Sequence, residues 1–354
     1  MAKQVTIIDV AKLAGVSVST VSRVINKNPK VDPVMEQKVK EAILELNYIP
    51  NVYARGIRGD NTRTIAAIVP NLSDNFFSKV VEGITRATDD YGIKLMIFSC
   101  HGDSNLEYKS LKSASEAGIS GLLYCPSAEV NSEKIYEYFS KDFPLIIVYR
   151  RGVIKNVPHI YHDNIKGGYI SAKYLLRQGR RSILFIASMW GEPFADIDNM
   201  LRFMDSAQRG AYSSLDRLEG HIQALYEEGI DFDKAYLIRT GYDFDSGYNT
   251  AKKVLSMLLD FDAVICSNDS VAAGVLQALS EQKISVPEQV SIVGYDDSVF
   301  STIARPTITS VKQKPYVVGY GSVEMLLKRM AGEQVSDRII DVELVVRNST
   351  SMKK

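Results

Sequence analysis

Polar and aromatic side chains gather where several apolar segments of this chain end. The runs concerned are Asp74-Asn75-Phe76-Phe77, Asp163-Asn164, Asn268-Asp269 and Tyr295-Asp296-Asp297, with Arg217 and Tyr242 close to two further segments. Carboxylates, amides and a guanidinium pair well with the hydroxyls of a sugar, and aromatic rings offer it an apolar face. The sequence therefore predicts a binding site for a small polar molecule.

Each of these residues also has a purely structural interpretation. Asp and Asn at the start of a helix usually cap it, and capping is the better interpretation of Asn268 or Asp163 when each is taken alone. Six such positions fall at the ends of apolar segments, and this coincidence favours the binding site.

A second set of polar side chains lies near the N-terminus. Thr6 and Asp9 are spaced as a capping box, Gly15 suits a sharp reversal, and Ser17 can cap a second short helix. The side chains that this second helix turns outward are Val18, Ser19, Thr20, Ser22 and Arg23. Hydroxyls and a guanidinium suit phosphates and base edges. A helix-turn-helix entering the major groove of DNA is predicted, and an ordinary helical hairpin in a core is the alternative.

The segment after a third helix can form one more short helix. Pro50 blocks continuation of the preceding helix and Asn51 can cap a new one. About two turns fit, which is marginal for an isolated helix, and Gly56 weakens it by about 1 kcal/mol more. We expect this helix to form when something docks against it, and a plain interdomain linker is the alternative.

From residue 64 onward, apolar segments alternate with amphipathic ones. The expected strands are Ile65–Pro70, Ile93–Cys100, Gly121–Pro126, Leu145–Tyr149, Ile183–Ala187, Ala235–Ile238, Ala263–Ser267 and Val290–Tyr295. The helix patterns between them include Phe77–Tyr91, Ile165–Gln178, Leu218–Glu228, Tyr248–Leu259, Val271–Gln282 and Tyr316–Met330. Nearly continuous apolar strands joined by helices predict parallel sheets covered on both faces. So many strands favour two α/β subdomains, with a ligand in the cleft beyond their strand ends.

The N-terminal motifs resemble the DNA-binding headpiece of the LacI/GalR family of bacterial transcriptional regulators. They are Asp9-Val10-Ala11, Ala14-Gly15-Val16-Ser17, Thr20-Val21-Ser22-Arg23-Val24-Ile25-Asn26, Tyr48-Ile49-Pro50-Asn51 and Ala54-Arg55. The resemblance implies a homodimer on palindromic double-stranded operator DNA, with Ile57 as an apolar wedge in the minor groove. The DNA-binding residues it implies are Thr6, Ser17, Val18, Ser19, Thr20, Ser22, Arg23, Asn26, Asn51, Tyr53, Ala54, Ile57 and Arg58.

The remaining chain is similar to the effector-binding core of the same family. The matching runs include Asn75-Phe76-Phe77, Asp163-Asn164, Arg217-Leu218-Glu219-Gly220, Asn268-Asp269, Val293-Gly294-Tyr295-Asp296-Asp297 and Thr309-Ser310-Val311-Lys312-Gln313. The effector contacts implied are Phe76, Phe77, Asp163, Arg217, Tyr242, Asn268 and Asp296. Residues 189–216 are longer than the family's usual loop, which makes Arg209 a rival of Arg217. Since no leucine heptad follows residue 350, a dimer is expected.

The expected fold class is therefore α/β with a small all-α headpiece. The boundaries are 1–49 for the helix-turn-helix, 50–63 for the hinge helix and linker, and 64–354 for two doubly wound, periplasmic-binding-protein-like subdomains. We place the first subdomain at about 64–161 plus 313–333 and the second at about 162–312 plus 334–354.

Composition and the remaining motifs narrow the class further. Net charge is zero over 354 residues, but residues 1–63 carry ten Lys and Arg against six Asp and Glu, which weakly favours phosphate contact at that end. The three cysteines are far apart, and the four histidines lack metal-ligand spacing. Neither a secretory leader nor a long apolar run occurs, so we expect a cytoplasmic protein with no membrane partner, cofactor or metal. No enzyme motif of the GxSxG, HExxH or GxGxxG type occurs either.

These observations predict a sequence-specific DNA-binding transcriptional regulator. Our main interpretation is a repressor of carbohydrate-utilisation genes, controlled allosterically by a sugar-like effector. A corepressor-dependent regulator responding to a nucleoside, a purine or a partner protein is the alternative. A solute-binding transport protein shares the two-lobed design, but that class would have a secretory leader and no headpiece.

Overall fold

The computed structural model of the chain describes residues 6–25, 31–46, 64–127, 132–189, 194–206 and 209–353. The chain divides into two compact units, Met1–Thr62 and Arg63–Lys354. The helix expected within residues 50–63 lies outside the described residues. In the described parts, no helix is long and apolar enough to cross a membrane.

The first unit contains the expected helix-turn-helix. Its helices are α1 (Ile7–Ala14), α2 (Val18–Ile25) and α3 (Pro33–Glu45). Thr6 and Asp9 form the capping box, Gly15 is left-handed at φ +65°, and Ser17 Oγ accepts the Thr20 N–H at 3.1 Å. The side chains that close the small core between the helices are Val10, Ala11, Ala14, Val21, Val24, Val39 and Ala42.

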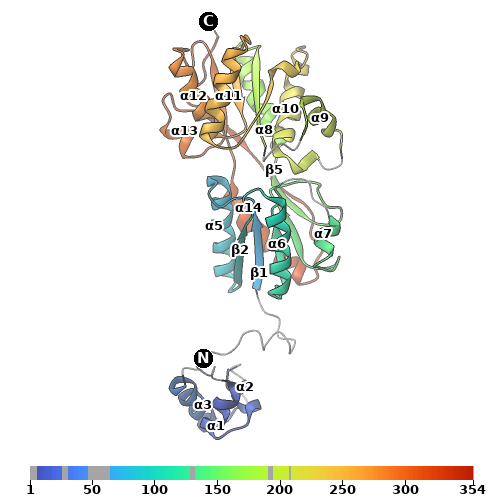
Figure 1. The fold of residues 1–354 in the computed structure, drawn as a ribbon, viewed down its shortest axis with the longest axis vertical. Coiled ribbons are helices and arrows are strands. Elements are labelled where there is room, and N and C mark those ends of the chain that lie inside the picture. Colours follow the sequence, from blue (N-terminus) through green and yellow to red (C-terminus); the bar gives the residue numbers. More distant parts are fainter. Residues whose placement is uncertain are drawn as a thin grey trace. The chain divides into compact units, whose positions relative to one another are not determined.

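The second unit contains two six-stranded sheets (Figure 1). The first has the order β11-β5-β4-β3-β1-β2 and is parallel throughout. Its strands are β1 (Thr64–Val69), β2 (Lys94–Ser99), β3 (Gly121–Tyr124), β4 (Leu145–Val148), β5 (His159–His162) and β11 (Arg338–Ile340).

The second sheet has the order β12-β10-β9-β8-β6-β7, and β12 alone runs antiparallel to its neighbour. Its strands are β6 (Ile183–Ser188), β7 (Leu237–Thr240), β8 (Ala263–Cys266), β9 (Ser291–Asp296), β10 (Thr309–Lys312) and β12 (Glu343–Val345). The strand expected at Ala235–Ile238 was placed too early: a 3-10 turn, Lys234–Tyr236, precedes β7.

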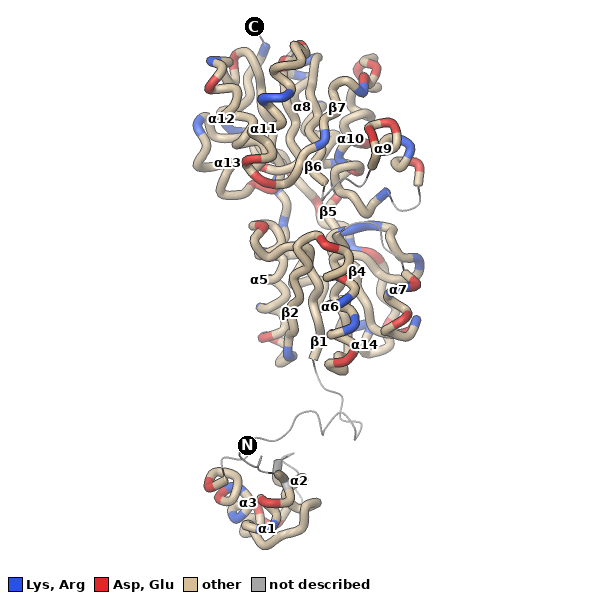
Figure 2. The backbone as a smooth tube through the Cα atoms, in the orientation of Figure 1, with Lys and Arg blue, Asp and Glu red and all other residues tan. Residues whose placement is uncertain are grey.

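Helices cover both faces of each sheet, as the continuous apolar strands require. In the first sheet, α5 (Asn75–Asp90) and α14 (Pro315–Met330) pack on one face, and α6 (Ser104–Glu116) and α7 (Ser132–Tyr136) on the other. In the second, α11 (Phe244–Ser256) and α12 (Asp269–Glu281) oppose α8 (Asn164–Arg177) and α10 (Ser213–Glu227). The short helix α9 (Ile197–Phe203) lies in the connection after β6, and the short helix α13 (Val299–Ile303) lies in the connection after β9. Strands β1, β3, β4, β6 and β8 carry no charged side chain, as the tan colour of β1, β4 and β6 shows in Figure 2.

The chain passes between the two sheets three times: after β5, after β10 and after β11. The third passage corrects the expected subdomain boundary at residue 334. Because β11 pairs with β5 in the first sheet, the chain enters the second sheet after Ile340. The passages place the carboxyl ends of strands from both sheets around one cleft.

Candidate functional site

The strand-end residues of both sheets line one cavity. Its lining consists of Asp74, Phe76, Phe77, Tyr149, Arg150, Arg217, Tyr242, Ser267, Asn268 and Asp296. The first five follow β1 or β4 of the first sheet, and the other five belong to the second sheet and its helices. This is the position at which parallel α/β sheets bind ligands.

Arg217 is the central side chain of the cavity. It is buried on α10, and its Nε donates to Asn164 Oδ1 at 3.0 Å. One terminal nitrogen donates to the Ser267 carbonyl and the other to Tyr149 Oη at 3.2 Å. The guanidinium carbon lies 3.6 Å from the centre of the Tyr295 ring, a cation–π distance. Arg217 is thereby fixed by residues from both sheets.

Three aromatic rings form the apolar wall of the cleft. Phe76 lies 4.5 Å from Tyr149 and 5.2 Å from Phe77, centre to centre, and Phe77 lies 5.4 Å from Tyr149. All three are buried. Two of the three pairs are edge-to-face, a favourable arrangement of aromatic rings, so this wall can present an apolar surface to a sugar ring or a base.

Asp296 and Asn268 supply the polar wall. Asp296 ends β9 at φ +100°, an unfavourable backbone conformation for a residue with a side chain, and accepts a hydrogen bond from Gln313 at 2.7 Å. Burial raises the pKa of Asp296 well above its usual value, and Arg217 opposes the shift. Asn268 caps α12 through Val271 N–H and donates to the Tyr242 carbonyl at 2.9 Å.

The cleft is nearly filled by its own side chains. The space open to the centre of a water molecule is about 20 Å³, which holds about one water. A monosaccharide needs more room than that, so binding requires the two sheets or the lining side chains to move apart.

Six of the seven effector contacts implied by the sequence line this cavity, and Asp163 does not. Asp163 Oδ1 accepts the Lys166 N–H at 2.9 Å and caps α8, which is the structural alternative for that residue. Arg209 does not line the cavity either, because it pairs with Glu219 at 3.3 Å. Contact of the six residues with an effector stays a prediction.

Three lining residues were missed from the sequence: Tyr149, Arg150 and Ser267. Tyr149 and Ser267 were assigned to the ends of strands, but β4 ends at Val148 and β8 at Cys266. Both residues therefore leave the sheet and turn toward the cleft. The signal that could have found them is the general rule that the first residues after a parallel strand form the site.

The outward face of α2 is the second candidate site. Ser19 and Arg23 are exposed, whereas Thr20 and Ser22 are half-buried. Val18 was expected to face outward, but it is half-buried against the core of the first unit. Ser17 Oγ lies 2.7 Å from Ser19 Oγ and 2.8 Å from Thr20 Oγ1. The exposed hydroxyls of Ser17 and Ser19 and the Arg23 guanidinium suit phosphate and base contacts.

The other implied DNA contacts divide into two groups. Thr6 is exposed, and its hydroxyl donates to Asp9 at 2.7 Å within the capping box. The implied contacts that lie outside the described residues are Asn26, Asn51, Tyr53, Ala54, Ile57 and Arg58. For these six residues, contact with DNA stays a prediction from the sequence.

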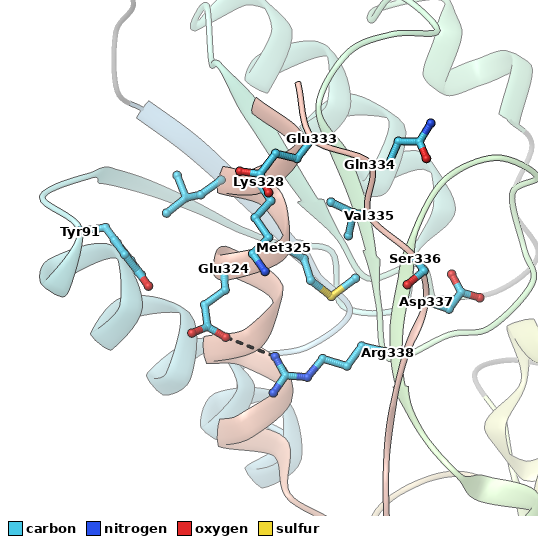
Figure 3. Close-up of a pocket in the computed structure, with 11 residues that line it drawn as sticks. Tyr91, Glu324, Met325, Lys328, Glu333, Gln334, Val335, Ser336, Asp337 and Arg338 are labelled. Carbon is cyan, nitrogen blue, oxygen red and sulfur yellow. Dashed lines mark hydrogen bonds and ion pairs between the residues drawn. The ribbon is translucent and has the colours of Figure 1, made fainter. Parts of the chain in front are cut away.

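A larger cavity of about 590 Å³ lies elsewhere, between α14 and residues 333–338 (Figure 3). Met325, Leu327 and Val335 are apolar lining residues. Glu324 and Arg338, both also in its lining, pair with each other at 3.2 Å. This cavity shares no lining residue with the strand-end cavity. Its larger volume alone therefore does not make it the better candidate for the effector site.

The described residues offer little to a metal ion or to thiol chemistry. Within them, no group of three His, Cys, Asp or Glu side chains could hold a metal. Cys100, Cys125 and Cys266 are buried free thiols, and burial raises the pKa of Cys100 to about 11. A thiol with so high a pKa is a poor nucleophile near neutral pH.

Two family models match the chain. The model described as bacterial regulatory proteins, lacI family, matches residues 6–51. The model described as periplasmic binding proteins and sugar binding domain of LacI family matches residues 62–351.

Relatives of known role match along nearly the whole chain. The HTH-type transcriptional regulator RegA of Clostridium saccharobutylicum is 31% identical over 345 residues, covering 97% of this chain and 98% of its own length. The lac repressor dimer bound to operator and an anti-inducer has a TM-score of 0.82 at 25% identity, covering 99% of this chain and 100% of its own. The complex of the regulator CelR with cellobiose has a TM-score of 0.70 at 28% identity, covering 98% and 100%.

Asp269, the chain neighbour of the lining residue Asn268, is a carboxyl group whose protonation depends on pH near neutrality. It is fully buried, and its carboxylate accepts hydrogen bonds from Ser310 Oγ and Ser298 N–H, each at 2.6 Å. Burial nevertheless raises the pKa of Asp269 to about 7. The folded protein therefore holds a proton on this group that the unfolded chain releases near pH 4.

We predict that Asp269 lowers the free energy of unfolding as pH rises from about 4 to about 7. Relative to Asp269→Asn, the wild-type chain should lose up to about 4 kcal/mol across this window. Urea unfolding of both proteins at several pH values, followed by fluorescence of the single tryptophan, measures the difference. A difference that does not change with pH would show that Asp269 is charged in the folded state throughout.

Proposed function

Because the chain belongs to the LacI family of bacterial regulatory proteins, we propose that it is a repressor of carbohydrate-utilisation genes with a sugar-like effector. A homodimer acting in the cytoplasm would hold a palindromic operator with two copies of α2. The effector would occupy the strand-end cleft. The observation that carries the proposal is that one chain combines the exposed hydroxyl and guanidinium face of α2 with a cleft lined by residues of both sheets.

The solved relatives support this assignment of roles. The lac repressor dimer is bound to operator, and CelR is bound to cellobiose. The aromatic wall of Phe76, Phe77 and Tyr149 could equally stack a nucleobase, so a nucleoside effector is the second candidate. A panel of sugars and nucleosides separates the two.

An ion pair joins the first sheet to a helix of the second, and through it an effector could change how the two sheets are arranged. Arg151 follows β4 of the first sheet, and its guanidinium makes two hydrogen bonds to Asp216 of α10, at 2.9 and 2.7 Å. Arg151 also lies 3.6 Å from Glu219. Each partner is the chain neighbour of a residue that lines the cavity, Arg150 or Arg217. A ligand that moves the lining arginines therefore acts on the contact between the sheets.

A second contact lies at the chain passages. His162 ends β5, and its Nε2 accepts the Lys314 N–H at 2.9 Å. Burial, and then Arg217, lower the pKa of His162 to about 3, so the imidazole stays neutral. We propose that effector binding rotates the sheets about these passages and alters the alignment of the two DNA-binding units in the dimer. Coupling of about 1–3 kcal/mol changes operator affinity about 5- to 150-fold.

The DNA half of the proposal is tested at Arg23. Arg23→Ala should cost about 1–3 kcal/mol at one operator position and relax base preference there. Lys40→Ala on α3, an exposed lysine paired with Glu36, is the matched loss of a cation and should leave base preference unchanged. Binding to a set of single-base operator variants measures both. An equal loss on every variant operator would mean that Arg23 contacts a phosphate.

The effector half is tested by a pair of aspartates. Asp296→Ala should abolish the response of operator binding to the effector, because a polar lining group is lost. Asp163→Ala should lose a helix cap, at about 1 kcal/mol of stability, and keep the response. Operator titrations with and without effector compare the two variants. A normal response in Asp296→Ala would remove that residue from the site, and a lost response in Asp163→Ala would return Asp163 to it.

A further inference from the structure

Arg150 is a buried cation for which the described residues provide no anion. Its side chain is 1% exposed, and it lines the cleft directly after the end of β4. Nε donates to the Pro126 carbonyl at 3.1 Å, and one terminal nitrogen donates to Ser213 Oγ at 3.2 Å. The other terminal nitrogen reaches the Ser127 carbonyl at 3.5 Å, the limit of a hydrogen bond.

Two other arginines, the buried Arg180 and the half-buried Arg151, have stronger partners for their terminal nitrogens. Arg180 is equally buried, and its terminal nitrogens donate to four backbone carbonyls at 2.7–3.2 Å, from Asp262, Pro287, Glu288 and Gln289. Arg151 holds Asp216 with two hydrogen bonds. A buried charge without a partner is strongly unfavourable. Arg180 Nε has no partner among the described residues, but both of its terminal nitrogens are well held. Arg150 also lies 4.7 Å from the centre of the Tyr149 ring, a cation–π distance, yet one of its terminal nitrogens is weakly held.

Two carboxylates share the cavity with Arg150, but each is engaged elsewhere. Asp74 Oδ1 caps α5 by accepting the Phe76 N–H at 2.7 Å, and Asp296 accepts from Gln313 and lies near Arg217. Among the described residues, neither forms an ion pair with Arg150 within 4.0 Å. A negative group on a ligand would therefore give Arg150 the ion-pair partner that the residues of the cleft do not provide.

The start of α10 adds donors at the same place. The helix begins at Ser213 without a side-chain cap, and Ser213 Oγ contacts both Arg150 and Tyr149 Oη, the latter at 2.9 Å. Uncapped helix starts favour anions. Nearby, two buried hydroxyls, Ser127 Oγ and Ser188 Oγ, have no hydrogen-bond partner within the part of the chain that the structure describes. Ser127 also offers its carbonyl to Arg150, and the Ser188 carbonyl accepts from Ser214 of α10.

We propose that the effector of this cleft carries an anionic oxygen group, a phosphate ester or a carboxylate, that pairs with Arg150 beside the start of α10. The inference rests on the proposed role of the cleft as an effector site and narrows the class of effector. The hydroxyls of the ligand would face Arg217, Asn268 and Asp296. The two terminal nitrogens of Arg150 would bind two oxygens of the anion. One would turn from the Ser127 carbonyl, and the other would use the hydrogen that it does not donate to Ser213 Oγ.

The test uses the full chain and inorganic phosphate as the first probe. Phosphate at about 50 mM should raise the melting temperature of the wild-type chain above that in chloride of equal ionic strength. Arg150→Gln should lose this shift, and Arg150→Lys, which keeps the charge, should retain part of it. Each variant is compared with its own melting temperature without phosphate. An equal shift in wild type and Arg150→Gln, or no shift in either, would overturn the proposal.

The second arm compares ligands that differ by the anionic group. The matched probes are glucose, glucose 6-phosphate and glucuronate, with ribose and ribose 5-phosphate as a second pair. At least one anionic member should bind about tenfold or more tightly than its neutral partner, and Arg150→Gln should remove that difference. Comparing the affinity of glucose 6-phosphate with that of glucuronate shows whether the site prefers a phosphate ester or a carboxylate. Neutral sugars that bind as well as their anionic partners and release operator would overturn this inference while leaving the proposed effector role intact.

Stability of the free protein gives an independent readout. If Arg150 is kept for a ligand, Arg150→Gln removes a buried charge that forms no ion pair among the described residues, and it should melt no lower than the wild type. Arg180→Gln, at the other fully buried arginine, should melt clearly lower because its backbone partners are left unsatisfied. Equal destabilisation by the two substitutions would show that Arg150 is structural and would contradict the proposal.

Discussion

The close contact between α8 and α10 is the constraint on which the cleft depends. A Cβ on Gly168 of α8 would lie 1.8 Å from the Arg217 carbonyl oxygen, and a Cβ on Gly220 of α10 would lie 1.9 Å from the Ile165 carbonyl oxygen. The two backbones therefore touch on both sides of the crossing, and no larger residue fits without separating them. This contact sets Arg217 beside Asn164, the first residue of α8.

From that fixed point the cleft connects both sheets. Arg217 reaches Tyr149 after β4, the Ser267 carbonyl after β8 and the ring of Tyr295 in β9. A displacement of the Arg217 side chain would therefore alter its contacts with residues of both sheets. The strained backbone of Asp296 and the filled cavity fit a site that must rearrange to take its ligand. In the chain, the unit with the helix-turn-helix precedes the unit with the two sheets, whose first strand, β1, begins at Thr64.

The sequence predicted the parts of this arrangement that local chemistry determines. The capping box of Thr6 and Asp9, the left-handed Gly15 and the two parallel-dominated sheets follow from short-range patterns and strand composition. Parallel strands also explain why most strand-end residues could be placed at one cleft. What the sequence could not show was set by tertiary contacts. Asp163 and Asn268 are both polar caps at a helix start, yet only Asn268 lines the cavity.

The missed residues have a related cause. A helix was expected from Leu218, but α10 begins earlier, at Ser213, shortly after the 3-10 turn Arg209–Ala211. That earlier start brings Ser213 to Arg150, a contact between residues 63 apart in the chain. The pairing of β11 with β5 spans an even greater separation. Hydrophobic periodicity reports neither contact, since both depend on how the sheets are connected.

The central claim is that the cleft and the operator-binding surface are thermodynamically linked, and one reciprocal measurement tests it. With the full chain and the tightest-binding sugar or sugar phosphate, operator affinity is measured with and without ligand, and ligand affinity with and without operator. The account predicts the same factor from both, about 5- to 150-fold. A ligand that binds the cleft with one affinity whether or not operator is present, while operator affinity also stays constant, would contradict the account.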